Sequence, residues 1–447
     1  MIITSFLLVS VSLINADLTC KDQNGNPVDF FMSYKLPKDS KNKEIQGIKE
    51  GFAFFYLDGN VKSLMPSKHD LRDENQAIAH TLNQIYKAKN NLTMARVMWN
   101  DELPHSAEHH DESKEKSDEK DKTKESKTKK PSISNKVFKI INKKVSEVKK
   151  IAKREAERKT VAKKPTVKKL SSKKESTKKT LSKKKSNEVI DKDSSDKNKT
   201  SGINSSKYAH AKGTLAFDKE SGFYLIHSIP GFPPVSNYSY PNSGTNYGQS
   251  ILCITVKFSQ VDEIAKQLYF DRPQVYNGYL PTSLVSKVPY FSKVLAGEYQ
   301  KDKSKTSSVT EIKSRNNVVF KSFAKTAAFK NDLYDGLVAP TLKTGLIVET
   351  WRRGKEVELN CSVEHPISDV RTFSVIKTST FTYTQDHSKL AISADKNKPY
   401  VCIGDINRMT TQYTRGGGTT CLMDIYIWKQ YYSIPKNITS CDTNGNN

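Results

Sequence analysis

A short pattern of residue types occurs twice in this chain with the same spacing: a His, a Lys two residues later and an Asp eight residues later. The copies are His210, Lys212 and Asp218, and His387, Lys389 and Asp395. Side chains at i and i+2 of a strand project from one face, so each His and Lys could meet one anion together. Two copies supply a neutral imidazole to attack phosphorus, a protonated imidazole for the leaving oxygen, and ammonium groups for the equatorial oxygens. The repeat therefore predicts phosphodiester cleavage without a metal ion.

The segments that follow the two copies also correspond. Ser228 comes eighteen residues after His210, and Asp405 eighteen residues after His387, each near the end of an apolar run. The pattern H-x-K, Asp and then G-D-x-N, which ends at Asn407, resembles the signature of the phospholipase D superfamily. Five residues separate Lys from Asp here, where that signature has four.

The amino-acid sequences of further segments are similar to those of one branch of that superfamily, the deoxyribonuclease II family. The similarity runs from Cys20 to Cys441 and is interrupted once. It rests on Val28-Asp29-Phe30-Phe31, Tyr34-Lys35-Leu36-Pro37, Trp99-Asn100-Asp101, His210-Ala211-Lys212-Gly213, His227-Ser228-Ile229-Pro230, Tyr247-Gly248-Gln249-Ser250, Asp386-His387-Ser388-Lys389, Gly404-Asp405-Ile406-Asn407-Arg408 and Arg415-Gly416-Gly417-Gly418.

This resemblance implies roles for the repeated residues. His210 would be the nucleophile that forms a phosphohistidine, and His387 the general acid. Lys212 and Lys389 would stabilise the charge of the five-coordinate phosphorus. Residue types alone do not decide which His attacks. The two Asp residues of the repeat are expected to fix strand ends rather than take part in the chemistry.

Three further residues are candidates for substrate binding. His227 matches a functionally important histidine of the family. An interpretation of His227 as a buried, hydrogen-bonded core histidine explains the sequence equally well. Asn407 can donate to a phosphate oxygen, whereas its counterpart after the first copy, Pro230, cannot. Arg415 begins a glycine run whose backbone N–H groups could meet a phosphate, and a tight turn explains the same glycines equally well.

The start of the chain and its cysteines indicate export. Residues 1–16 form a short, mostly apolar run that ends in Asn15-Ala16, which predicts a signal peptide, and no later segment has the roughly twenty apolar residues of a membrane span. An even number of cysteines in an exported chain favours disulfides, and residue spacing leaves fifteen pairings open. The resemblance implies Cys20 with Cys253, Cys361 with Cys441, and Cys402 with Cys421.

Sequons support the same compartment. Glycosylation is expected at Asn91, Asn237 and Asn437, and further sequons occur at Asn198, Asn204 and Asn360.

One block of the chain is unusually basic. Residues 111–200 contain 32 Lys and Arg against 15 Asp and Glu, which is +17 of the total +25. Such a segment cannot bury enough apolar surface to fold alone, so an insert over 105–206 is predicted to be disordered. Apolar residues recur at helical spacing between Val137 and Ile151, which predicts a basic amphipathic helix that forms on binding. A DNA tether is the favoured role, with another acidic partner as the alternative.

The expected fold is a mixed αβ sandwich of two phospholipase D-like halves, packed as a pseudo-dimer with one shared active site. The halves would be 17–104 with 207–290, and 291–447. Strands are expected near 52–57, 215–226, 249–256, 345–348 and 401–406, and helices near 74–87, 261–267 and 321–333. No cofactor is expected, and the acidic and His-rich stretch at 105–112 is interpreted as a charged linker rather than a metal site.

The sequence thus predicts a secreted or lysosomal acid endodeoxyribonuclease that acts on DNA without metal and leaves 3′-phosphate ends. Two alternatives remain. One is a catalytically weak or inactive DNA- or partner-binding member of the family, and the other is a lipid phosphodiesterase on the same scaffold. The oligomeric state and the base preference are not readable from the sequence.

Overall fold

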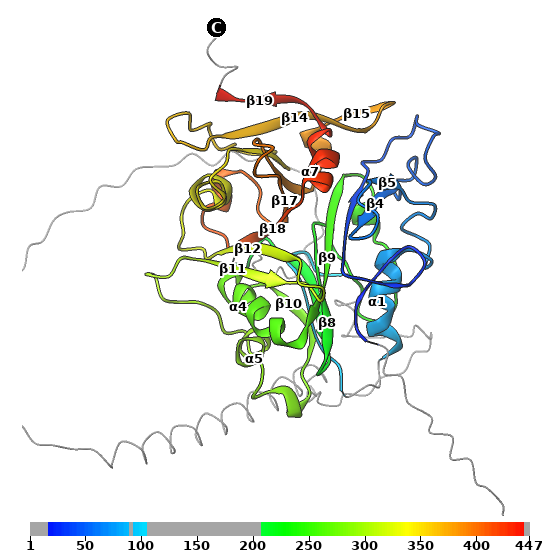
Figure 1. Cartoon of the computed structure of the whole chain (residues 1–447), viewed down its shortest axis with the longest axis vertical. Coiled ribbons are helices and arrows are strands. Elements are labelled where there is room, and N and C mark those ends of the chain that lie inside the picture. Colours follow the sequence, from blue (N-terminus) through cyan, green and yellow to red (C-terminus); the bar gives the residue numbers. More distant parts are fainter. Residues whose placement is uncertain (1–16, 89–92, 105–206, 442–447) are drawn as a thin grey trace, which may run out of the picture. The chain divides into compact units, whose positions relative to one another are not determined.

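The computed structural model describes residues 17–88, 93–104 and 207–441, which fall within a single unit of the chain (Figure 1). The predicted signal segment, the Lys-rich insert with its predicted helix, and the sequons at Asn91, Asn198 and Asn204 lie outside the described residues. Within these ranges, no helix has the length and apolar character needed to cross a membrane.

Eight strands form the first sheet, in the order β10-β6-β7-β8-β9-β3-β4-β5, and all neighbours are antiparallel. A separate ribbon pairs β1 (Cys20–Lys21) with β2 (Pro27–Val28). The strands of the sheet are β3 (Phe30–Lys35), β4 (Phe54–Asp58), β5 (Met65–Pro66), β6 (Ala95–Asn100), β7 (Lys212–Phe217), β8 (Ser221–His227), β9 (Gln249–Lys257) and β10 (Val275–Tyr279).

The second sheet has nine strands, in the order β11-β12-β18-β17-β16-β13-β14-β15, with β19 also paired to β14. Its one parallel pair is β13 with β14. The strands are β11 (Ser307–Lys313), β12 (Val319–Lys325), β13 (Leu346–Thr350), β14 (Ile367–Ile376), β15 (Ser379–Thr382), β16 (Lys389–Ser393), β17 (Tyr400–Gly404), β18 (Gly417–Met423) and β19 (Pro435–Thr439).

Five strands of each sheet follow the same path. The order β6-β7-β8-β9-β3 in the first sheet matches β13-β16-β17-β18-β12 in the second, and the chain visits the strands in the same sequence in both. The Lys of each H-x-K begins the second strand of its set, β7 or β16. Each repeat of the sequence pattern therefore occupies an equivalent place in its sheet.

Helices flank the two sheets (Figure 1), and buried apolar side chains form a core between them. The helix α1 covers the outer face of the first sheet, and α6 lies in the core on the outer face of the second. The two inner faces meet in one core, together with α4, α5 and α7. The helices are α1 (Ala77–Lys87), α4 (Val261–Asp271), α5 (Pro289–Leu295), α6 (Ala339–Leu342) and α7 (Ile425–Tyr432), with short helical turns at Asn242–Gly244, Phe258–Gln260, Thr282–Leu284, Tyr334–Val338, Tyr383–Gln385 and Thr410–Gln412.

The local sequence explains α1, the predicted helix near 74–87. The side chain of Gln76 caps it by accepting from the backbone N–H groups of Ile78 and Ala79. Ile78, Leu82 and Ile85 recur at helical spacing and are buried against the sheet. The mixed α/β class is confirmed, as are the helices near 74–87 and 261–267.

Two expected elements differ from the structure. The segment 215–226 is a hairpin rather than one strand, because Asp218 accepts from the backbone N–H groups of Glu220 and Ser221 at 2.7 and 3.0 Å and turns the chain. Asp395 makes the same kind of turn with Asn397 N, at 2.8 Å. Both Asp residues thus fix strand ends, as predicted.

The helix predicted at 321–333 is wrong. Residues up to Lys325 belong to β12, which pairs with β11 on one side and β18 on the other. Pairing with a strand on each side satisfies the backbone hydrogen-bonding groups of this stretch, so tertiary contacts outweigh the local helical preference. The structure contains all three disulfides that the resemblance implied: Cys20–Cys253, Cys361–Cys441 and Cys402–Cys421.

Candidate functional site

Contacts between the two sheets hold the backbone of each repeated histidine. The backbone N–H of His210, which precedes β7, donates to the carbonyl of Gly416, which precedes β18, at 3.0 Å. The backbone N–H of His387, which precedes β16, donates to the carbonyl of Gly248, which precedes β9, at 2.9 Å. Each histidine is therefore placed by a glycine that leads into a strand of the opposite sheet.

The ring of His210 is oriented by hydrogen bonding. Its Nδ1 donates to the carbonyl oxygen of Asp405 at 2.7 Å, so the neutral ring carries its lone pair on Nε2. Burial and the nearby Lys212 lower the pKa of His210 well below its usual value, against the opposing effect of Asp101. A neutral imidazole with a free Nε2 lone pair has the form that a nucleophile requires.

Asp101 is the centre of the charges around His210. It forms an ion pair with Lys212, its Oδ2 lies 3.1 Å from Arg415 Nη2, and the same oxygen lies 3.7 Å from His210 Nε2. Burial alone would raise the pKa of Asp101, but these three cationic or imidazole neighbours hold it well below the usual value. Asp101 is therefore a buried anion that balances the cations of this site.

Asp405 contributes through both its backbone and its side chain. Its carbonyl accepts from His210, and its carboxyl group accepts from the backbone N–H of Lys212. Burial raises the pKa of Asp405 to about 7, although Lys212 opposes the rise. This residue of the second sheet thus contacts both members of the first H-x-K.

Packing between two aromatic side chains orients the ring of His387. Tyr247 stacks on it with ring centres 4.2 Å apart and planes at 6°, and Trp351 packs at 4.2 Å and 49°. Among the described residues, His387 Nε2 has no hydrogen-bond partner. Burial lowers the pKa of His387 to about 2, assisted by the charges of Lys389 and Lys212. Burial and the neighbouring lysines therefore favour the neutral form of His387.

The chain around His387 is anchored by Asp386. This buried carboxylate accepts from the hydroxyl groups of Tyr34 and Ser388, both at 2.8 Å, and from the backbone N–H of Ser388 at 2.9 Å. Lys389 donates from Nζ to the carbonyl of His387. Burial lowers the pKa of Lys389 to about 7, with the charge of Lys212 next in importance.

The two copies influence each other electrostatically. Lys212 of the first copy lowers the pKa of both His387 and Lys389 of the second, and Lys389 in turn lowers the pKa of His210. The four side chains predicted from the repeat are thus brought within range of one another's charges, although the two copies lie more than 170 residues apart in the sequence.

The other predicted site residues occupy different surroundings. His227, the last residue of β8, is fully buried, and its Nδ1 accepts from the backbone N–H of Ile229 at 3.2 Å. Burial lowers its pKa to about 3. Asn407 is buried two residues after Asp405. Arg415 donates to the carbonyl of Ala209 at 3.1 Å besides pairing with Asp101, so it supports the segment that leads to His210. The sequon residues Asn237, Asn360 and Asn437 are exposed.

Sequence reasoning did not assign a role to three residues of this site. Asp101 and Tyr247 stand in segments similar to the family, but their types alone did not indicate a contact with a histidine. Nothing in the sequence pattern pointed to Trp351. Only the folded chain brings these side chains against His210 and His387.

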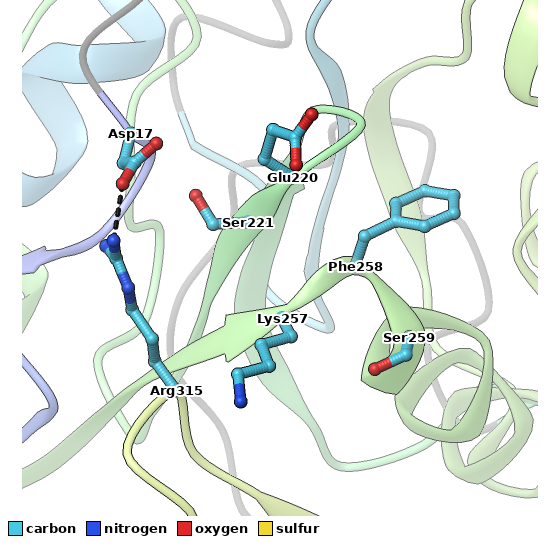
Figure 2. Close-up of a pocket in the computed structure, with 7 residues that line it drawn as sticks. All are labelled: Asp17, Glu220, Ser221, Lys257, Phe258, Ser259 and Arg315. Atoms are coloured by element: carbon cyan, nitrogen blue, oxygen red, sulfur yellow. Dashed lines mark hydrogen bonds and ion pairs between the residues drawn. The ribbon is translucent and has the colours of Figure 1, made fainter.

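A separate cavity of about 390 Å³ lies elsewhere (Figure 2). Its lining includes two acidic and two basic side chains, and the ion pair of Asp17 with Arg315, at 2.5 Å, spans one side of it. None of the four H-x-K residues lines this cavity. In the part of the chain that the structure describes, no group of three or more His, Cys, Asp or Glu side chains is arranged to hold a metal ion.

Comparison with known proteins shows the family of this chain. The family model of deoxyribonuclease II matches residues 19–129 and 141–441. Deoxyribonuclease-2 of Caenorhabditis elegans is 40% identical over 96% of this chain and 96% of its own length. Plancitoxin-1 of Acanthaster planci is 29% identical over 95% of this chain and 92% of its own length. Deoxyribonuclease-2-alpha of Rattus norvegicus is 28% identical over 98% of this chain and 99% of its own length.

Among solved structures, polyphosphate kinase from Porphyromonas gingivalis aligns with a TM-score of 0.24 at 10% identity, over 50% of this chain and 32% of that one, which is too low to indicate a common fold. The family match spans nearly all of the described residues and includes both H-x-K copies. The chain therefore belongs to the deoxyribonuclease II family and is a hydrolase of the deoxyribonuclease class.

Proposed function

We propose that this protein is an acid endodeoxyribonuclease that cleaves DNA phosphodiester bonds without a metal ion and leaves 3′-phosphate ends. The observation that carries the proposal is the placement of His210, Lys212, His387 and Lys389 within range of one another's charges. These groups supply a nucleophile, an acid and two cations for one phosphate, which is what the reaction needs.

In this proposal the two sheets are two phospholipase D-like halves, 17–104 with 207–290 and 291–447, that form a pseudo-dimer around one shared site. The matching paths of β6-β7-β8-β9-β3 and β13-β16-β17-β18-β12 support the division. The reciprocal hydrogen bonds from His210 to Gly416 and from His387 to Gly248 support a site that needs both halves.

His210 acts as the nucleophile. Its Nδ1–H is held by the carbonyl of Asp405, which leaves the Nε2 lone pair for attack on phosphorus and formation of a phosphohistidine. His387 acts as the general acid that protonates the 5′ oxygen as the P–O bond breaks. It then accepts a proton from the water that hydrolyses the phosphohistidine, and the 3′-phosphate is released. Lys212 and Lys389 stabilise the charge on the equatorial oxygens.

The acid preference follows from the charges around His387. Burial, Lys389 and Lys212 keep this imidazole neutral in the free protein, with a pKa of about 2. A DNA phosphate brings a negative charge, which favours the protonated form of the acid. Productive binding therefore includes uptake of a proton, and low pH favours it. A secreted or lysosomal location is compatible with this requirement and with the predicted signal peptide.

The test is digestion of supercoiled plasmid by purified protein at pH 5 in excess EDTA, with end analysis of the products. Cleavage with 3′-phosphate ends is expected, because imidazole and ammonium groups perform each step. Loss of cleavage in EDTA with recovery on addition of magnesium would contradict the proposal. DNA binding without cleavage would favour the inactive family member, and preferential hydrolysis of phospholipid over DNA the lipid phosphodiesterase.

A further inference from the structure

Two buried lysines occupy matching positions in the two sheets. Lys35 is the last residue of β3 and pairs with Gln249, the first residue of β9. Lys325 is the last residue of β12 and pairs with Gly417, the first residue of β18. The pair β12 and β18 can be followed side by side in Figure 1. Both lysine side chains are fully buried, which is unusual for this residue type.

Each ammonium group is held by backbone carbonyl groups of one loop. Lys35 Nζ donates to the carbonyls of Thr245 and Tyr247, the latter at 2.7 Å, in the loop before β9. Lys325 Nζ donates to the carbonyls of Gln412, Tyr413 and Arg415, at 2.9, 3.2 and 2.6 Å, in the loop before β18. A charged donor on several buried carbonyls fixes the course of these loops.

The residue that follows each bonded segment contacts a histidine of the other sheet. Gly248 comes directly after Tyr247, and its carbonyl accepts from His387 N. Gly416 comes directly after Arg415, and its carbonyl accepts from His210 N. Neither glycine has room for a side chain. A Cβ at Gly248 would lie 2.4 Å from Asp386 Oδ1, and one at Gly416 would lie 2.0 Å from the carbonyl oxygen of Asp271.

We propose that Lys35 and Lys325 are positioning residues, each for the histidine of the opposite sheet. Lys35 in the first sheet fixes the position of His387, and Lys325 in the second sheet fixes the position of His210. Both side chains are fully buried, so the carbonyl groups of the protein, rather than water, must accept the hydrogen bonds of the two Nζ atoms. The assignment of each lysine to one chemical role rests on the proposed function, with His210 as nucleophile and His387 as acid.

The test compares two substrates that differ in their need for an acid. DNA has a poor alkoxide leaving group that must be protonated. Thymidine 3′-(p-nitrophenyl phosphate) releases p-nitrophenolate, which leaves as an anion without a proton. The burst of p-nitrophenol in the first turnover reports the attack of the nucleophile alone. Lys35→Met and Lys325→Met remove the charged donor while keeping the length of the side chain.

Lys35→Met is expected to slow DNA cleavage at least tenfold and to change the p-nitrophenol burst rate less than threefold. Lys325→Met is expected to slow both reactions at least tenfold. Lys313→Met is the matched control, because Lys313 also ends a strand, β11, but is exposed. It should leave both rates unchanged. Thermal melting checks folding, and Lys35→Gln and Lys325→Gln replace any variant that does not fold.

Equal losses on both substrates in folded Lys35 variants, or unchanged rates in either set, would overturn the assignment of each lysine to the histidine of the opposite sheet. Failure of the proposed function gives a different result. In that case wild-type protein cleaves neither substrate, or His387→Ala loses the p-nitrophenol burst together with DNA cleavage, whatever the lysine variants do.

Discussion

In the proposed mechanism, the pH dependence of DNA cleavage follows from the protonation state of His387. This residue must be protonated to act as an acid, and its pKa in the free protein is about 2 because of burial and the neighbouring lysines. Above that pKa the protonated fraction falls about tenfold for each pH unit. Because kcat/KM reports the free enzyme, log kcat/KM should fall with a slope of about −1 between pH 4.5 and 6.5, roughly a hundredfold in total. Burial also lowers the pKa of His210 well below its usual value, which favours the neutral form of the nucleophile.

The assay is initial-rate cleavage of a fluorescent oligonucleotide duplex at constant ionic strength in EDTA. The p-nitrophenol burst from thymidine 3′-(p-nitrophenyl phosphate) is the control, and it should be nearly independent of pH because its leaving group needs no proton. A plateau in kcat/KM for DNA within this range, or a rise with pH, would refute the reasoning. The same slope in the burst would show that the titrating group is not the acid.

Four further predictions concern single groups or segments. Changing His210 or His387 to Ala should lower kcat on DNA at least tenfold with binding nearly intact in filter assays, since acid–base groups contribute about a hundredfold or more; a variant above a tenth of wild-type rate would show a wrong assignment. Asp101→Asn should cost about 3 kcal/mol in urea unfolding at pH 7, because Lys212 and Arg415 lose a buried counter-charge, and an unchanged midpoint would contradict this. Burial raises the pKa of Asp405 to about 7, above the unfolded value, so its contribution to stability is present at pH 4 and lost as the pH rises to 7; the melting temperature of Asp405→Asn relative to wild type should therefore increase over this interval, and a constant difference would exclude the shift. Deletion of 111–200, with its charge of +17, should weaken DNA binding and flatten its salt dependence while kcat is kept, whereas equal salt slopes would exclude a DNA tether.

Several residues of the candidate site could be predicted from the sequence because their types recur at a fixed, short spacing. A Lys at the first residue of a strand and a His two residues before it are neighbours wherever that strand lies, and the second copy repeats the arrangement. The turn-forming Asp218 and Asp395 likewise act within three residues, so their role could be predicted without the fold. Helix α1 was predictable for the same reason, since its cap and its apolar face are both local.

The tertiary structure decided everything that depends on contacts between distant segments. The stretch at 321–325 has no strong strand pattern, and it becomes β12 because β11 and β18 flank it. Asp101, Tyr247 and Trp351 meet the two histidines only after both sheets have formed. The low pKa of His387 likewise depends on burial and on Lys212, which lies far away along the chain. Spacing along the chain determined which side chains are candidates for the proposed reaction, while packing between the two sheets determined their surroundings and the residues that hold them.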